Sequence, residues 1–223
     1  MGEGAPYQKL KSDYALVVFQ CALGMIVIFL PSILEHKFKI EISESMHIVF
    51  FIFLYGAIYL GEVRDFYYQV PNWDAIQHTL SGGMLGALGF SVVDFLNKNV
   101  SMRLSPLFIA FFAFCFSVTL GTLWEIYEFS ADGILGLNMQ KFMTENGTIL
   151  VGRAALKDTM KDLIVDCGGA FCVCLMGCLS RIRIQNKTTS QVQQGNFEGN
   201  PAKGPKVDCE IMENLQSIGG KRK

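Results

Sequence analysis

Ionisable residues stand at helical spacing beside long apolar segments of this sequence. Asp74 and His78 are four residues apart, and Glu125 and Glu128 are three apart. A third set repeats a carboxylate every four residues, at Asp158, Asp162 and Asp166. Residues three or four apart share one face of a helix, so each set presents its polar side chains in one direction. Carboxylates and an imidazole brought together in this way can transfer protons or hold a metal ion.

The ligand types indicate which metal such a site would take. The candidate metal ligands are Asp74, His78, Glu125, Glu128, Asp162 and Asp166. Because carboxylate oxygens dominate this set, it favours a hard divalent cation, Mg or Mn ahead of others. Zinc would normally require more His or Cys, and a di-iron bundle would require two Glu-x-x-His pairs. For catalysis the candidates are His78 as general base or ligand, and Glu125 and Asp162 as acid–base groups or ligands.

The elements that must position these residues are five apolar segments. They cover Tyr14–Leu34, Ser45–Gly61, Asp74–Val93, Leu104–Trp124, and a fifth from near Asp158 to Ser180. A helix needs about 20 residues to cross the ~30 Å of bilayer hydrocarbon. Because lipid offers no partner to an unpaired backbone group, each span must be a helix. The sequence therefore predicts an all-α polytopic membrane protein, a bundle of about five transmembrane helices.

Composition supports one membrane domain with polar ends. The chain is 51% hydrophobic and only 17% charged, which is too apolar for an ordinary soluble domain. We predict a short polar N-terminus at 1–13, a transmembrane helical domain at 14–180, and a polar tail at 181–223. The tail is rich in Gln, Asn, Gly and Lys, and we expect it to be disordered. A formal net charge of −1 argues against nucleic acid as a partner.

Antiparallel helices would bring the ionisable sets to one membrane face. The second segment ends, and the third begins, on the side where the fourth ends and the fifth begins. We therefore expect the six candidate ligands to converge in one pocket with Glu62 at its rim. A carboxylate at the bilayer centre costs at least ~2.5 kcal/mol, so something must offset these charges. The candidates are a bound cation, shared protons, or the nearby Arg64, Arg153, Lys157 and Lys161; the alternative is that solvent simply wets the helix ends.

Glycines on the same helical stripes should let the helices approach closely. These glycines are Gly82, Gly86, Gly121 and Gly169.

Three motifs in order resemble a known family. They are "YLGEVRDFYYQVPNWDAIQHTLSG", "GTLWEIYEFSAD" and "DTMKDLIVDCGGA", within Tyr55–Gly177. Together they resemble the YjdF-like family of uncharacterised bacterial inner-membrane proteins. The order D-x-x-x-H, W-E-x-x-E, D-x-x-x-D is more distantly similar to VanZ-like membrane proteins. The resemblance implies a polytopic bacterial membrane protein but no settled activity, and by position the six candidate ligands match the polar motif residues of the family.

Three classes of function fit these observations. The first is a metal-dependent membrane hydrolase or transferase acting on a lipid-linked or amphipathic substrate. The second is a cation- or proton-coupled transporter or binding protein, and the third is a non-catalytic structural or regulatory membrane protein. A deep blind pocket would favour the enzyme, whereas a continuous polar path across both faces would favour the transporter. In each case the expected partner is the lipid bilayer and the expected location is the bacterial plasma membrane, with several passes.

Overall fold

The described part of the chain is helical almost throughout. The computed structural model describes residues 11–99, 104–144 and 147–198. Its helices are α1 (Lys11–Val27), α2 (Leu30–Phe38), α3 (Glu44–Leu54), the π-helix η1 (Tyr55–Val63), α4 (Phe66–Gln69), α5 (Trp73–Asn99), α6 (Pro106–Leu135) and α7 (Arg153–Glu198). Five stretches are long and apolar enough to cross a membrane: Tyr14–Phe38, Glu44–Val63, Trp73–Asn97, Pro106–Leu135 and Arg153–Gln191. The predicted all-α polytopic bundle is confirmed.

Local signals explain where the helices begin and end. The Ser43 side chain accepts a hydrogen bond from the Met46 amide at the start of α3, at 3.3 Å. Ser105 does the same for the Phe108 amide at the start of α6, where Pro106 occupies the first turn. These are serine N-caps, which satisfy backbone donors that the helix leaves unpaired. At the other end of α6, Gly136 adopts φ +66° and stops the helix.

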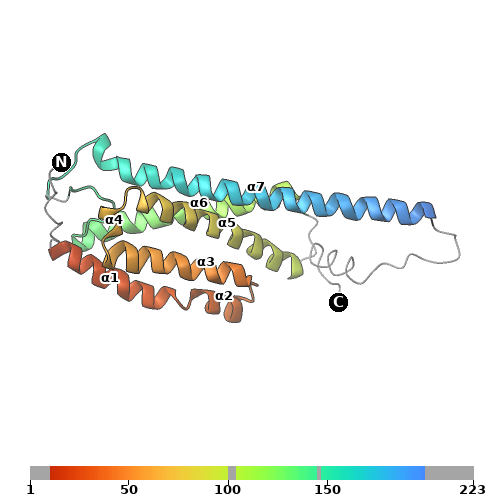
Figure 1. Ribbon diagram of the computed structural model, residues 1–223, viewed down its shortest axis with the longest axis horizontal. Helices are drawn as coiled ribbons and strands as arrows, with labels where there is room; N and C mark the ends of the chain where they lie inside the picture. The colour runs from red at the N-terminus through yellow and green to blue at the C-terminus, as the bar shows by residue number, and fades with distance from the viewer. Residues whose placement is uncertain (1–10, 100–103, 145–146, 199–223) are drawn as a thin grey trace.

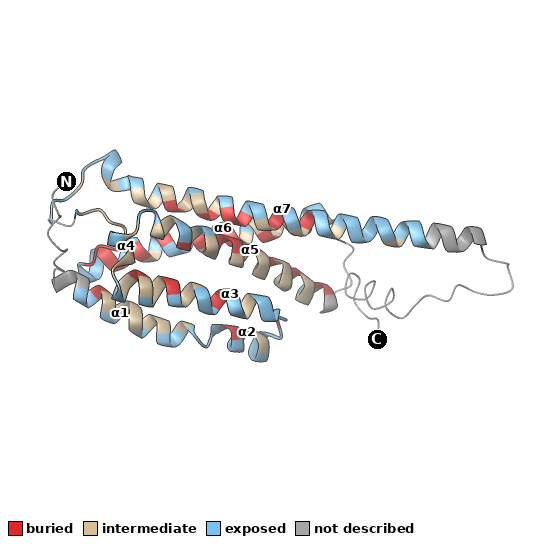
Figure 2. Cartoon of the chain, viewed as in Figure 1, coloured by how far each residue is buried: buried red, intermediate tan, exposed pale blue. Residues whose placement is uncertain are grey.

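Three long helices form the centre of the bundle (Figure 1). α7 packs along α5 and α6, and α5 also packs against α6. The N-terminal hairpin, α1 with α3 and η1, lies beside them, and its contacts to the centre pass mainly through α5. Buried residues accordingly follow the facing sides of α5, α6 and α7 (Figure 2).

Glycine makes the close packing of α5 and α7 possible, as predicted. A side chain at Gly82 would overlap the backbone of Asp166, and one at Gly169 would overlap the carbonyl of Thr79. A Cβ at Gly86 would come within 3.2 Å of the Cys174 sulfur. Small residues at a helix interface let two backbones approach to this degree.

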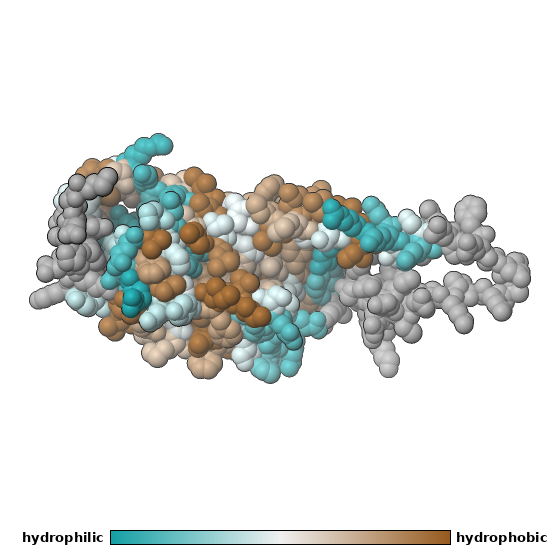
Figure 3. Space-filling model, in the orientation of Figure 1, coloured by the Kyte–Doolittle hydropathy of each residue, from teal (hydrophilic) through white to brown (hydrophobic). Residues whose placement is uncertain are grey.

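The outer surface suits a bilayer. In the view of Figure 3, hydrophobic side chains cover much of the middle of the bundle, and hydrophilic ones gather toward its ends. Large apolar side chains such as Val18, Met25 and Phe129 are exposed. Exposed hydrocarbon over a helical bundle is the pattern of a lipid-facing surface.

Several predicted boundaries need correction. The fourth helix does not end at Trp124 but continues to Leu135, where the left-handed conformation of Gly136 ends it. Glu125 and Glu128 therefore lie inside the helix, Glu128 about two turns before its end. The fifth helix begins at Arg153, not near Asp158, and continues past Ser180 to Glu198. The expected disorder is thus absent from residues 181–198, and residues 199–223 lie outside the described part.

Candidate functional site

His78 joins α5 to α7. Its Nδ1 lies 3.3 Å from Asp166 Oδ2. The Ser81 hydroxyl, one turn further along α5, donates to the other oxygen, Asp166 Oδ1, at 3.0 Å. Asp166 is buried and lies against Gly121 of α6, where an added Cβ would come within 2.9 Å of Oδ2. A glycine at that position is therefore what makes room for the carboxylate between the three helices.

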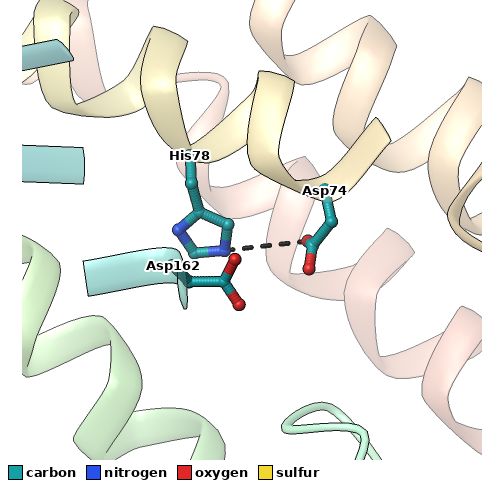
Figure 4. A group of neighbouring side chains, drawn as sticks. All are labelled: Asp74, His78 and Asp162. Atoms are coloured by element: carbon teal, nitrogen blue, oxygen red, sulfur yellow. Dashed lines mark ion pairs between the residues drawn. The ribbon is translucent and has the colours of Figure 1, made fainter. Parts of the chain in front are cut away.

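Asp74 lies on the other side of the imidazole (Figure 4). Its Oδ1 is 3.7 Å from His78 Nε2, as expected for residues four apart on α5. Asp162 of α7 lies beside this pair. Asp74, His78 and Asp162 each offer one ligand atom, and the three atoms lie within 4.8 Å of one another. This is the group of described residues whose geometry comes nearest to a metal-binding set.

Glu125 and Glu128 project from α6 toward the same region. Both are buried. The Trp124 indole donates to Glu128 Oε1 at 2.9 Å, whereas Glu125 interacts with the Thr159 side chain of α7 without a hydrogen bond of normal geometry. Both glutamates are close enough to His78 of α5 to interact with it electrostatically, and Glu125 also interacts in this way with Asp158 and Asp166 of α7. The six candidate ligands thus lie at the same end of the bundle, but the expected convergence in one pocket holds only in part: Asp74, His78, Glu128 and Asp166 line the cavity described below, whereas Glu125 and Asp162 do not. The roles assigned to all six remain predictions.

Sequence reasoning missed the principal cation of the site, Lys141. Its ammonium group bonds the Asp74 carboxylate and lies 3.5 Å from Asp158 Oδ2. The basic residues proposed from the sequence do not take this place. Arg64, Arg153 and Lys157 are exposed, and Lys161 interacts electrostatically with Asp158. The sequence did not predict Lys141 because this residue lies in a non-helical connection, where no periodicity indicates the direction of a side chain.

That connection is held down by specific hydrogen bonds. The buried Asp132 carboxylate accepts from the Met139 and Gln140 amides, at 2.8 and 3.0 Å. The Gln140 side-chain amide donates to Thr159 on α7 at 2.9 Å. Leu137 and Met139 bury their side chains against Leu16 of α1 and Ala131 of α6. The segment therefore closes the ionisable end of the bundle and fixes Lys141 above it.

The environment of the connection alters two proton affinities. Burial alone would lower the pKa of Lys141, but the carboxylates of Asp74 and Asp158 outweigh it and raise this pKa above its usual range. Burial, aided by the charges of Asp74 and Glu62, raises the pKa of the Tyr67 hydroxyl. Lys141 also lies over the Tyr67 ring, with 5.5 Å between Nζ and the ring centroid. Both groups are therefore fully protonated at neutral pH.

Comparison of the sequence with known protein families and proteins gives the family. A family model described as "Predicted membrane protein (DUF2238)" matches residues 7–183. The chain belongs to this family. The DUF2238 match covers all five spans in large part and every residue of the site. An uncharacterised protein of Thermotoga maritima is similar as well, 26% identical over 156 residues, which is 70% of this chain and 69% of the relative. No solved structure matches.

These relatives do not carry a stated activity, so the chemistry of this DUF2238 chain rests on its own residues. We refer to Asp74, His78, Glu125, Glu128, Lys141, Asp158, Asp162 and Asp166 as the acidic cluster. Its carboxylates outnumber its cations: Asp74 and Asp158 share Lys141, and Asp166 is bound to His78. Asp162 Oδ1 and both oxygens of Glu125 are buried and have no hydrogen bond of normal geometry to described residues.

A cavity of about 400 Å³ opens beside the acidic cluster. At this end it is lined by Glu62, the residue expected at the rim, and by five residues of the cluster, namely Asp74, His78, Glu128, Lys141 and Asp166. From there it continues between the N-terminal hairpin and helices α5 and α6. The residues lining this continuation are mostly apolar and include Leu23, Val27, Phe50, Leu54, Leu85 and Leu120. A single cavity thus joins an ionisable end to a hydrocarbon-lined end.

Proposed function

We propose that this chain is a multi-pass enzyme of the bacterial plasma membrane, a divalent-cation-dependent hydrolase or transferase. Its substrate is amphipathic or lipid-linked, with the polar group at the acidic cluster. The observation that carries this proposal is the cavity, which joins the cluster to an apolar interior. Ligand pockets are typically apolar with a few convergent polar groups, and this cavity has that character.

The residues present fit a hard divalent cation. Asp74, His78 and Asp162 would hold it, with Glu125 close by. A bound cation would also offset the burial of three carboxylate oxygens, on Glu125 and Asp162, that have no hydrogen bond of normal geometry to described residues. The chemistry that such a cation supplies when bound is polarisation of a phosphoryl or carbonyl oxygen and activation of water.

Residues of the chain would manage the protons. If His78 donates its Nδ1 hydrogen to Asp166, then Nε2 carries a lone pair directed toward Asp74 and Asp162. From there Nε2 can accept a proton from an attacking hydroxyl or bind the cation. Glu125 interacts with His78 by its charge but does not line the cavity, so it would return a proton to a leaving group through His78 or through a bridging water.

Transport receives less support from the same cavity. Ionisable pairs at the other end of the bundle, Asp94 with Arg181 and Glu35 with His47, do not line it. A polar ion crossing the bundle would have to pass the wall around Val27 and Phe50, which offers it no ligand. The apolar end of the cavity thus gives a charged solute no ligand among the described residues that line it.

Lipid turnover by the purified protein tests the proposal. The protein in nanodiscs is incubated with a bacterial total lipid extract, with Mg²⁺ or Mn²⁺ and then with chelator, and the lipids are analysed by mass spectrometry. We expect a product that requires the cation and is lost in Glu125→Gln and Asp162→Asn. Glu44→Gln, an exposed carboxylate at the far end of the bundle, is the control and should retain turnover. Unchanged lipids, or full turnover by both site variants, would refute the proposal.

A further inference from the structure

The cavity changes character along its length. Near the membrane face, its lining includes Glu62, Asp74, His78 and Lys141. The lining also includes two amides, Gln20 of α1 and Gln77 of α5, of which Gln77 lies at the level of His78. Beyond them the lining becomes apolar on both sides. The N-terminal hairpin contributes Leu23, Val27, Leu30, Phe50 and Leu54, and the central helices contribute Met84, Leu85 and Leu120.

The cavity, measured from its ionisable end to its apolar end, is long enough to hold a polar head followed by an extended chain. At a helix rise of about 1.5 Å per residue, Leu85 lies about 16 Å further along α5 than Asp74. On α1 and α2 the lining runs from Leu16 to Leu30, about 21 Å by the same rise. The bilayer hydrocarbon is ~30 Å thick, so the cavity extends past its middle. A ligand with a hydrocarbon tail suits this depth, since a polar ligand would find no hydrogen-bonding partner there.

Gln77 is an amide beside the ionisable part of the cavity, directed toward the N-terminal hairpin. Its side chain is buried, 6% exposed, and its Oε1 makes no hydrogen bond to a described residue. The amide lies against Gly56 of η1, where an added Cβ would come within 3.3 Å of Oε1. A buried amide oxygen without a partner costs free energy unless a ligand donor or a water reaches it. A ligand with a hydroxyl or amide hydrogen between head and tail would provide that donor.

We infer that the cavity binds one extended acyl or prenyl chain of a single-chain lipid. The polar head lies at the acidic cluster, the linking group lies at Gln77, and the tail reaches Val27, Leu30 and Phe50. These three residues line the far end, so a larger side chain at one of them should shorten the chain that fits. This inference rests on the proposed function, because it assigns the substrate class of the same site.

Photo-crosslinking tests where the tail lies. The probes are two lysophosphatidylglycerols, one with a diazirine at the end of the acyl chain and one with a diazirine close to the headgroup. Each is added to the full chain in nanodiscs and irradiated, and labelled peptides are located by mass spectrometry. We expect the chain-end probe to label the segments around Leu30 and Phe50, and the headgroup-proximal probe to label the α5 segment around Gln77. An excess of unlabelled lysolipid should compete with both.

A matched pair of variants on α1 gives the control. Val27→Trp fills the far end of the cavity, whereas Met25→Trp places the same bulk on the lipid-facing side of the helix, where Met25 is exposed. Val27→Trp should lower chain-end labelling about tenfold, equivalent to about 1.4 kcal/mol of overfilling. Met25→Trp should leave labelling unchanged. Thermal unfolding of both variants verifies that each is folded.

The outcomes separate this inference from the proposed function. If the two probes label only lipid-facing residues such as Val18 and Ile26, and label the same ones, they report bulk lipid, and this would overturn the inference. So would equal labelling of Val27→Trp and the wild type. Because the crosslink needs neither cation nor turnover, ordered labelling without cation-dependent turnover would reject the proposed function alone. Turnover without ordered labelling would reject the tail site alone.

Discussion

His78 and Asp166, 88 residues apart in the chain, meet inside the bundle with 3.3 Å between Nδ1 and Oδ2. The contact ties α5 to α7 and fixes which imidazole nitrogen points toward Asp74 and Asp162. A carboxylate behind a histidine commonly sets its tautomer and orientation and raises its basicity as a ligand. Asp166 is therefore better described as a positioning residue for His78 than as a ligand of its own.

Replacing Asp166 by Asn tests this positioning role. The variant keeps the shape of the side chain but removes the charge that orients His78. We expect Mn²⁺ affinity, measured by electron paramagnetic resonance, to fall about 10- to 100-fold. Ser81→Ala removes only the hydroxyl bound to Asp166 Oδ1 and should have a smaller effect. If Asp166→Asn binds Mn²⁺ as tightly as the wild type, the contact is structural only.

Neutralising the unpartnered carboxylates should separate stability from function. Glu125→Gln and Asp162→Asn remove a buried charge at little cost in packing, so each variant should be at least as stable as the wild type in chelator. With Mg²⁺ or Mn²⁺ at a hundred times its Kd, wild-type stability should rise by about 2.7 kcal/mol, and both variants should lose most of this gain. Thermal unfolding in detergent measures it. Lower stability of the variants in chelator would instead indicate that the carboxylates hold the fold together.

Lys141 should make stability depend on alkaline pH. Since its pKa is raised in the folded chain, its contribution is complete below its ordinary value of about 10.4 and is lost as pH rises through the higher pKa. Wild-type stability should therefore fall above that pH, whereas Lys141→Arg should fall less, because a guanidinium stays protonated. The raised pKa of Tyr67 would also make stability fall at alkaline pH, so the comparison is made in a Tyr67→Phe background, with and without Lys141→Arg. Thermal unfolding as a function of pH measures the difference, and parallel curves would contradict the ion pair.

Removing the Lys141 charge altogether should be costly at neutral pH. Lys141→Met leaves Asp74 and Asp158 facing each other without a cation, and we expect a loss of about 1.5–3 kcal/mol. Adding Asp74→Asn removes one of the carboxylates and should recover part of that loss. Equal stability of Lys141→Met and the wild type would show that solvent already screens this pair.

Helical spacing was sufficient to find the carboxylates but not their partners. Glu125 and Asp162 were predictable because i, i+3 and i, i+4 repeats define one helix face, and antiparallel spans bring such faces together. Lys141 was not predictable, since a connection has no period that gives a side chain its direction. One signal was present: Asp132, a carboxylate near the end of a helix, is of a type that binds the backbone of the following loop. The polar composition after Ser180 suggested disorder, whereas α7 continues as a helix to Glu198.

The adjacent glycines of α7 offer the cleanest test of the helix packing that positions the site. A Cβ at Gly169 would overlap the Thr79 carbonyl on α5, whereas a Cβ at Gly168 would meet nothing within 4 Å. Gly169→Ala must therefore separate α5 from α7, and we expect a loss of about 1–3 kcal/mol. Gly168→Ala has the same change in composition but only improves helix propensity, so it should gain up to about 1 kcal/mol in stability.

Because His78 reaches Asp166 across this interface, Gly169→Ala should also weaken Mn²⁺ binding while Gly168→Ala should not. Both variants are compared by thermal unfolding and Mn²⁺ titration; equal effects of the two would mean that α5 and α7 are not packed as closely as the structure has them.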